Sequence, residues 1–194
     1  MRIAISGAVG VGKTTLANAL SKKLQLPLMQ ENFTEIVQAF NLGGLSKNNN
    51  LSQEILLENC RQACLHWLHD RLQLQEKNED FVQDRCAIDI LQRWLLFNLS
   101  GQNNAATSRF IKHCQDSLAC LDWVIIPPFN LSTELENENR LMRNSSLSIL
   151  FRGQGLIIGL AHMLIRRDRL LLLPSELLSV QEKVDFITAR IRQT

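Results

Sequence analysis

The chain has 194 residues, of which 45% are hydrophobic and 21% are charged, and its formal net charge at pH 7 is +2. These values are typical of one globular domain with a sizeable core. A net charge this close to neutral gives no indication of a nucleic-acid partner. The five cysteines include no C-x-x-C pair, so the sequence predicts neither a disulfide framework nor a zinc site.

The sequence also gives no sign of a membrane association. No apolar run approaches the ~20 residues that span a bilayer. The first residues lack the basic and then apolar pattern of a secretory leader. We therefore expect a cytoplasmic protein without a membrane or nucleic-acid partner, whose cysteines are reduced and fill core positions.

The first predicted strand, residues 3–5, leads directly into the pattern G-x-x-x-x-G-K-T. This pattern consists of Gly7, Ala8, Val9, Gly10, Val11, Gly12, Lys13 and Thr14. Its glycines let backbone N–H groups approach phosphate oxygens, Lys13 can reach the β- and γ-phosphates, and the Thr14 hydroxyl can ligate Mg²⁺. The helix that follows directs further N–H groups, including that of Thr15, toward the same anion. The pattern therefore predicts a binding site for the phosphates of ATP with Mg²⁺.

Strand-like and helical segments alternate along the rest of the chain. Helices are expected at residues 14–24, 33–40, 51–72, 88–95, 105–118 and 180–191, and strands at 26–29, 81–83, 123–126 and 170–173. This alternation predicts a three-layer α/β fold in which a five-stranded parallel sheet is flanked by helices. We expect one domain over residues 1–194. The long helix from Leu51 has an apolar face that could serve a homodimer as well as the core.

Charged residues follow the predicted strands at their carboxyl ends. Glu31 follows the second strand, Asp84 and Arg85 follow the third, and an arginine-rich segment follows the fourth. Because the carboxyl ends of parallel strands meet at one edge of the sheet, where ligands bind, these residues are candidates for one site.

In these features the chain resembles the P-loop nucleoside and nucleotide kinases. It is most similar to the NadR-like group of small ATPase and kinase domains. The matching parts are the loop at 7–14, Glu31, the D-R-x-x-x-D pattern of Asp84, Arg85 and Asp89, and the strand that runs into Pro127 and Pro128. The likeness follows the chain in order and is least clear from residue 131 to residue 170.

The resemblance implies roles that suit phosphoryl transfer, which needs alignment of the reactants and neutralisation of charge. With Lys13 on the phosphates, Asp84 would act with Thr14 on Mg²⁺ or orient the acceptor, and Arg85 would lie near the acceptor-side oxygens. Glu31 would accept the hydroxyl proton, as the corresponding acid does in deoxynucleoside kinases. Structural roles are the alternatives. Glu31 could cap a helix, Asp84 and Arg85 could form a structural ion pair, and Asp89 could be a first-turn acid matched to a helix dipole.

Kinases of this class carry a lid between the fourth and fifth strands, which predicts a lid within residues 131–165. Arg140, Arg143 and Arg152 lie in this connection. A guanidinium group can pair with phosphate in a bidentate manner, so Arg140 and Arg143 are candidates for nucleotide binding. The alternative is a solvated helical surface.

We thus expect an ATP- and Mg²⁺-dependent kinase acting on a small hydroxyl-bearing acceptor, with nucleoside-like molecules among the candidates. The alternative is a regulatory nucleotide-binding ATPase without a small-molecule acceptor. The N-K-x-D pattern that reads guanine in GTPases is absent from the sequence. Trp67 and Trp94 lie on helical core stripes and are expected to pack in the core rather than to stack on a base.

Overall fold

A computed structural model describes residues 1–30, 53–99, 101, 103–129 and 147–193. Its strands form one sheet in the order β2-β3-β1-β4-β5, and all neighbouring strands are parallel. The strands are β1 (Arg2–Ile5), β2 (Leu28–Met29), β3 (Phe81–Asp84), β4 (Trp123–Ile126) and β5 (Leu170–Leu172). The prediction of a five-stranded parallel sheet is confirmed.

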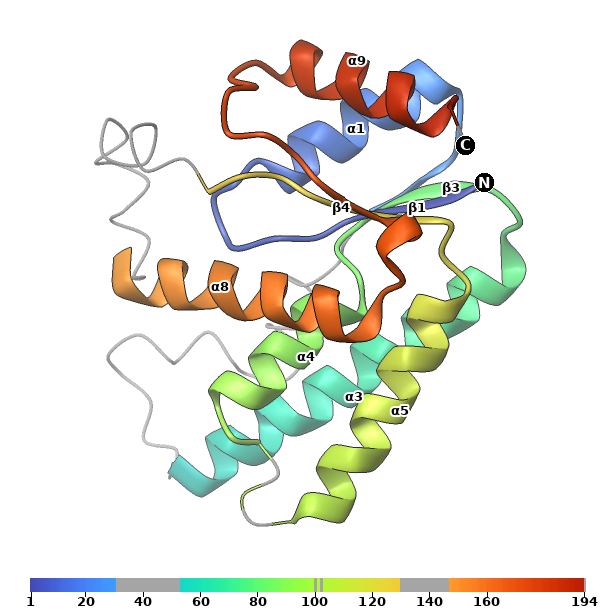
Figure 1. The fold of residues 1–194 in the computed structure, drawn as a ribbon. Helices are drawn as coiled ribbons and strands as arrows, with labels where there is room; N and C mark the ends of the chain where they lie inside the picture. The colour runs from blue at the N-terminus through green and yellow to red at the C-terminus, as the bar shows by residue number, and fades with distance from the viewer. Residues whose placement is uncertain (31–52, 100, 102, 130–146, 194) are drawn as a thin grey trace.

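Helices cover both faces of this sheet (Figure 1). On one face, α1 (Lys13–Leu24) and α9 (Val180–Ile191) pack against each other. The other face carries α3 (Gln53–Lys77), α4 (Ala87–Leu96), α5 (Asn104–Ala119) and α8 (Leu147–Leu164). A short 3-10 helix, Arg167–Arg169, precedes β5. The three predicted layers are therefore present. None of the helices in the described residues has the length and apolar character needed to cross a bilayer.

The central strand β1 is buried on both faces. Ile3 and Ile5 contact the apolar core that includes α1 and α9, whereas Ala4 belongs to the core on the opposite face. On β4, Ile125 packs in the core with α1 and α9, and Val124 packs in the core on the opposite face. A strand buried on both faces has a continuous apolar sequence instead of an alternating one, which is why both strands could be predicted.

Helix α8 occupies much of the range in which the sequence predicts only a lid. It contains Gly153, Gly155 and Gly159, which weaken the local helix signal because glycine has low helix propensity. Burial of Ile157 and Ala161 against the core stabilises the helix instead. The helix expected at 33–40 lies outside the described residues, as does the rest of the lid range up to residue 146.

All the cysteines are free thiols, and four of the five are buried. Burial raises the pKa of Cys64 to about 12. Because the thiolate is the reactive form, we expect at most one thiol of the native protein to react rapidly with Ellman's reagent at pH 8. The partly exposed Cys120 is the candidate, and all should react in denaturant. Cys120→Ser is the control, since it should remove the rapid phase. Rapid reaction of two or more native thiols would contradict this assignment.

Candidate active site

The phosphate loop connects the end of β1 to the start of α1. Gly12 is the N-cap of α1 and has a φ of +82°. An L-residue would be strained in this left-handed conformation, so the loop requires glycine at this position. No side chain caps α1, and no acidic residue lies in its first turn. The first N–H groups of the helix, including those of Lys13 and Thr14, are therefore suited to bind an anion.

Lys13 lies within the loop with only 5% of its surface exposed. Its ammonium nitrogen donates to the carbonyl oxygens of Gly7 and Ala8, each over 2.7 Å. These bonds hold the positive charge against the loop. The ammonium thus lies beside the N-terminus of α1, and both features favour a negatively charged ligand.

Thr14 and Asp84 join the phosphate loop to the end of β3. The Thr14 hydroxyl donates to Asp84 Oδ2 over 2.6 Å. Asp84 is 3% exposed, and within the described residues its Oδ1 atom has no hydrogen-bond partner. The register of the sheet pairs Asp84 with Ile5, so the carboxylate lies level with the start of the phosphate loop.

A buried carboxylate oxygen without a partner, next to a hydroxyl, fits a hard cation such as Mg²⁺. The described residues contain no group of three or more His, Cys, Asp and Glu side chains that could hold a metal ion. An Mg²⁺ ion at Thr14 and Asp84 would therefore need water and phosphate oxygens to complete its coordination, which is common for this ion.

Asp89, in the first turn of α4, also reaches the phosphate loop. Its Oδ2 atom accepts from the N–H of Cys86 over 2.9 Å, and its Oδ1 atom accepts from the N–H of Gly7 over 3.4 Å. Asp89 thus lies in the first turn of α4, where it caps the helix by accepting from the N-cap backbone, and it also links α4 to the phosphate loop. Arg85 precedes this turn, with a φ of +67° and its N–H bonded to the carbonyl of Ile5 over 2.9 Å.

Gln154 is a part of the site that sequence reasoning did not find. It lies buried on α8, and its Oε1 atom accepts from the N–H of Ala8 over 2.7 Å. Its Nε2 atom donates to the carbonyl of Pro127 over 3.0 Å. One amide thus connects α8, the phosphate loop and the end of β4. The available signal was a lone glutamine in an apolar helical stretch.

The structure brings Lys13, Thr14, Asp84 and Arg85 to one edge of the sheet. Three other candidates, Glu31, Arg140 and Arg143, lie outside the described residues. The third arginine predicted on this connection, Arg152, is exposed on α8.

The two tryptophans are buried, as expected of core residues. Trp94 stacks on Phe110 with ring centroids 4.1 Å apart. Trp67 lies under the guanidinium of Arg71, whose central carbon is 4.9 Å from the ring centroid.

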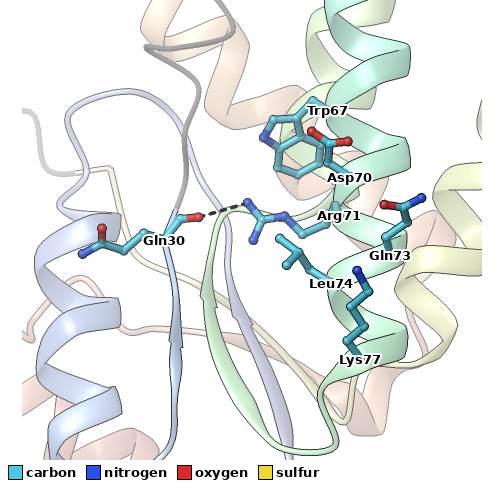
Figure 2. Close-up of a pocket in the computed structure, with 7 residues that line it drawn as sticks. All are labelled: Gln30, Trp67, Asp70, Arg71, Gln73, Leu74 and Lys77. Atoms are coloured by element: carbon cyan, nitrogen blue, oxygen red, sulfur yellow. Dashed lines mark hydrogen bonds between the residues drawn. The ribbon is translucent and has the colours of Figure 1, made fainter.

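A cavity of about 280 Å³ lies between the end of β2 and α3. Figure 2 shows Arg71 extending from α3 toward the backbone carbonyl of Gln30, to which it donates over 3.4 Å. Asp70 and Lys77 also line the cavity, so its wall carries charges of both signs. Gln30 immediately precedes Glu31, and the cavity therefore lies beside the point where the chain continues to that candidate base.

The sequence was compared with models of protein families, and one family model matches most of the chain. Residues 2–139 match the model of a family described as AAA domain. The chain belongs to this AAA domain family. No protein with a curated description matches the AAA domain chain.

Solved structures resemble this AAA domain protein over nearly its whole length. Deoxyadenosine kinase from M. mycoides with bound dCTP is 17% identical, with 100% of each chain covered and a TM-score of 0.70. Thymidylate kinase from Candida albicans is 14% identical, with 98% of this chain and 90% of that chain covered and a TM-score of 0.64. NadR in complex with NAD and AMP-PNP is 16% identical, with 97% and 48% covered and a TM-score of 0.62. The fold is that of P-loop nucleoside and nucleotide kinases, which confirms the resemblance inferred from the sequence.

Proposed function

We propose that this protein is an ATP- and Mg²⁺-dependent kinase that transfers a phosphoryl group to a hydroxyl of a small, nucleoside-like acceptor. The observation that carries the proposal is the arrangement of Lys13, Thr14 and Asp84 at the N-terminus of α1. The kinase fold supports it, because the neighbours with this fold act on nucleosides and nucleotides according to their names.

Lys13 and the loop N–H groups would bind the β- and γ-phosphates of ATP. Thr14 and Asp84 would hold Mg²⁺, which when bound would neutralise charge on the phosphates. Asp84 would keep its carboxylate in place through its bond with the Thr14 hydroxyl. Arg85 would lie near the acceptor-side oxygens, where its charge favours the transferred phosphoryl group.

The acceptor would bind beside the end of β2. The cavity between Gln30 and α3 supports this location, because Gln30 follows the carboxyl end of β2, and the phosphate loop follows the carboxyl end of β1 in the same parallel sheet. Glu31 would accept the proton of the acceptor hydroxyl. Arg140 and Arg143 would bind nucleotide phosphate from a lid within residues 131–165. The chain would act as one cytoplasmic domain over residues 1–194, with a homodimer as one assembly to test.

An acceptor screen tests the proposal. ATP turnover is measured by coupling ADP release to a reporter, with a panel of nucleosides, nucleotides and pyridine ribosides. Stimulation by one class of acceptor, with a phosphorylated product of the expected mass, supports the kinase and names its substrate class. Turnover that no acceptor changes would favour the regulatory ATPase instead.

Glu31→Gln separates these two functions. A kinase needs a proton-accepting group within hydrogen-bond reach of the acceptor hydroxyl, and glutamine cannot accept that proton. We expect transfer to the acceptor to fall by about 10²-fold or more, in line with the loss of general base catalysis. Affinity for Mg·ATP and slow background hydrolysis should change little, as calorimetry and phosphate release would show. Glu58→Gln on the exposed surface of α3 is the matched control. Equal transfer rates in the two variants would remove Glu31 from the mechanism.

A further inference from the structure

A row of buried polar side chains connects α5 to the turn after β3. Ser117 Oγ on α5 donates to Gln75 Oε1 on α3 over 2.9 Å, and Gln75 Nε2 donates to Gln83 Oε1 on β3 over 3.0 Å. Gln83 Nε2 then donates to the backbone carbonyl of Arg85 over 2.9 Å. We name Ser117, Gln75 and Gln83 the glutamine relay. All three side chains are at most 2% exposed.

The relay is not explained by core packing. Phe81, two positions before Gln83 on β3, belongs to the apolar core on the α3 side of the sheet, whereas Val82 packs on the α1 side. An apolar side chain at position 83 would continue the Phe81 surface without any need for partners. Burial of an amide costs free energy unless the amide is hydrogen-bonded, so packing alone does not account for two buried glutamines.

The relay ends at the backbone of Arg85, which has an unusual conformation. Arg85 adopts a φ of +67°, which residues other than glycine rarely adopt. Its N–H donates to the carbonyl of Ile5 over 2.9 Å, and its own carbonyl accepts from Gln83. Both peptide groups of Arg85 are therefore fixed. An unfavourable backbone conformation persists only where surrounding contacts determine it in this way.

We propose that the glutamine relay is a positioning device for Arg85. It holds the backbone in the left-handed conformation that turns the chain directly after Asp84, and so fixes the point from which the guanidinium approaches the transferred phosphoryl group. This inference rests on the proposed function, in which Arg85 lies near the acceptor-side oxygens. Ser117, Gln75 and Gln83 act only through Arg85, because their side chains are enclosed in the core.

The test replaces the relay as a unit with Ser117→Ala, Gln75→Met and Gln83→Met in one chain. Methionine is unbranched like glutamine, and joint replacement leaves no relay side chain without its partner. We expect a folded protein whose ATP affinity is unchanged and whose transfer rate falls by about tenfold to 10²-fold, the cost of a misplaced catalytic group. Thr188→Val is the control, since it removes a buried hydroxyl on α9, in the opposite layer, and should leave transfer unchanged.

A double-mutant cycle distinguishes positioning from a general structural role. If the relay acts through Arg85, replacing the relay residues should not lower the transfer rate any further in a chain that already carries Arg85→Ala. An equal loss of transfer in both backgrounds would overturn the inference.

Amide hydrogen exchange gives a readout that does not depend on activity. Replacing the relay should speed exchange of the Arg85 N–H by about tenfold relative to neighbouring strand amides, because local opening becomes easier. Unchanged exchange at Arg85 would overturn the relay even in an active kinase. Conversely, if no acceptor stimulates turnover by the wild type, the proposed kinase function fails. The exchange rate of the Arg85 N–H would still show whether the relay holds the backbone of Arg85. If the triple variant does not fold, exchange of the Arg85 N–H is compared in the single variants Ser117→Ala and Thr188→Val. Equal exchange rates in these two variants would also overturn the inference.

Discussion

Lys13→Ala is expected to lower ATP turnover by about 10³-fold, the upper range for the loss of one preorganised charge that stabilises a transition state. Lys13 is the positive side chain of the phosphate loop, and its ammonium is held beside the N-terminus of α1 by the carbonyls of Gly7 and Ala8. Alanine leaves the loop N–H groups in place but removes the charge that offsets that of the phosphates. Nucleotide affinity should therefore fall as well.

The fold should survive this substitution. Gln154 and Asp89 hold the phosphate loop through the N–H groups of Ala8 and Gly7, and neither bond involves Lys13. Lys22→Ala is the matched control, because Lys22 is exposed on the same helix. Circular dichroism and thermal unfolding would establish that both variants are folded, and calorimetry would give their nucleotide affinities. A folded Lys13→Ala protein with the turnover and affinity of Lys22→Ala would exclude the phosphate-binding role.

The sheet and the phosphate loop could be predicted because their signals are local. The strand at 123–126 is a continuous apolar run, and the helix at 180–191 has regular apolar spacing; both have these bounds in the structure. The loop is marked by its glycines and Lys13. A parallel sheet then brings the ends of its strands to one edge, which is why Asp84 could be expected near Thr14 before any distance was known.

The parts that sequence reasoning missed depend on contacts between distant residues. Gln154 and Ala8 are 146 positions apart, and Ser117 and Gln75 are 42 apart. No local pattern marks such pairs, because either glutamine alone is compatible with an exposed surface. Burial and hydrogen bonding became visible only when the helices were placed on the sheet. Glu31, Arg140 and Arg143 lie outside the described residues, so their roles stay predictions.

Asp84→Asn is expected to lower turnover by about 10²-fold or more, by analogy with the loss of another group that stabilises a transition state. Asparagine has nearly the same size and still offers an oxygen to the Thr14 hydroxyl, so the hydrogen bond between α1 and β3 can persist. What is lost is the negative charge beside the buried Oδ1 atom, and with it the strongest attraction for Mg²⁺. Nucleotide affinity should change less than turnover.

Thermal stability separates a metal-binding role of Asp84 from a structural one. A buried carboxylate with one unpaired oxygen costs free energy in the absence of a cation, so Asp84→Asn should unfold at the wild-type temperature or above it. The wild type should gain stability when Mg²⁺ is added with ATP, and the variant should gain much less, because a ligand stabilises only the state that binds it. Asp116→Asn, on the exposed surface of α5, should behave as the wild type in both measurements. Near-normal turnover of Asp84→Asn at saturating Mg²⁺, or a clear loss of stability without ligand, would instead make Asp84 a structural residue that joins α1 to β3.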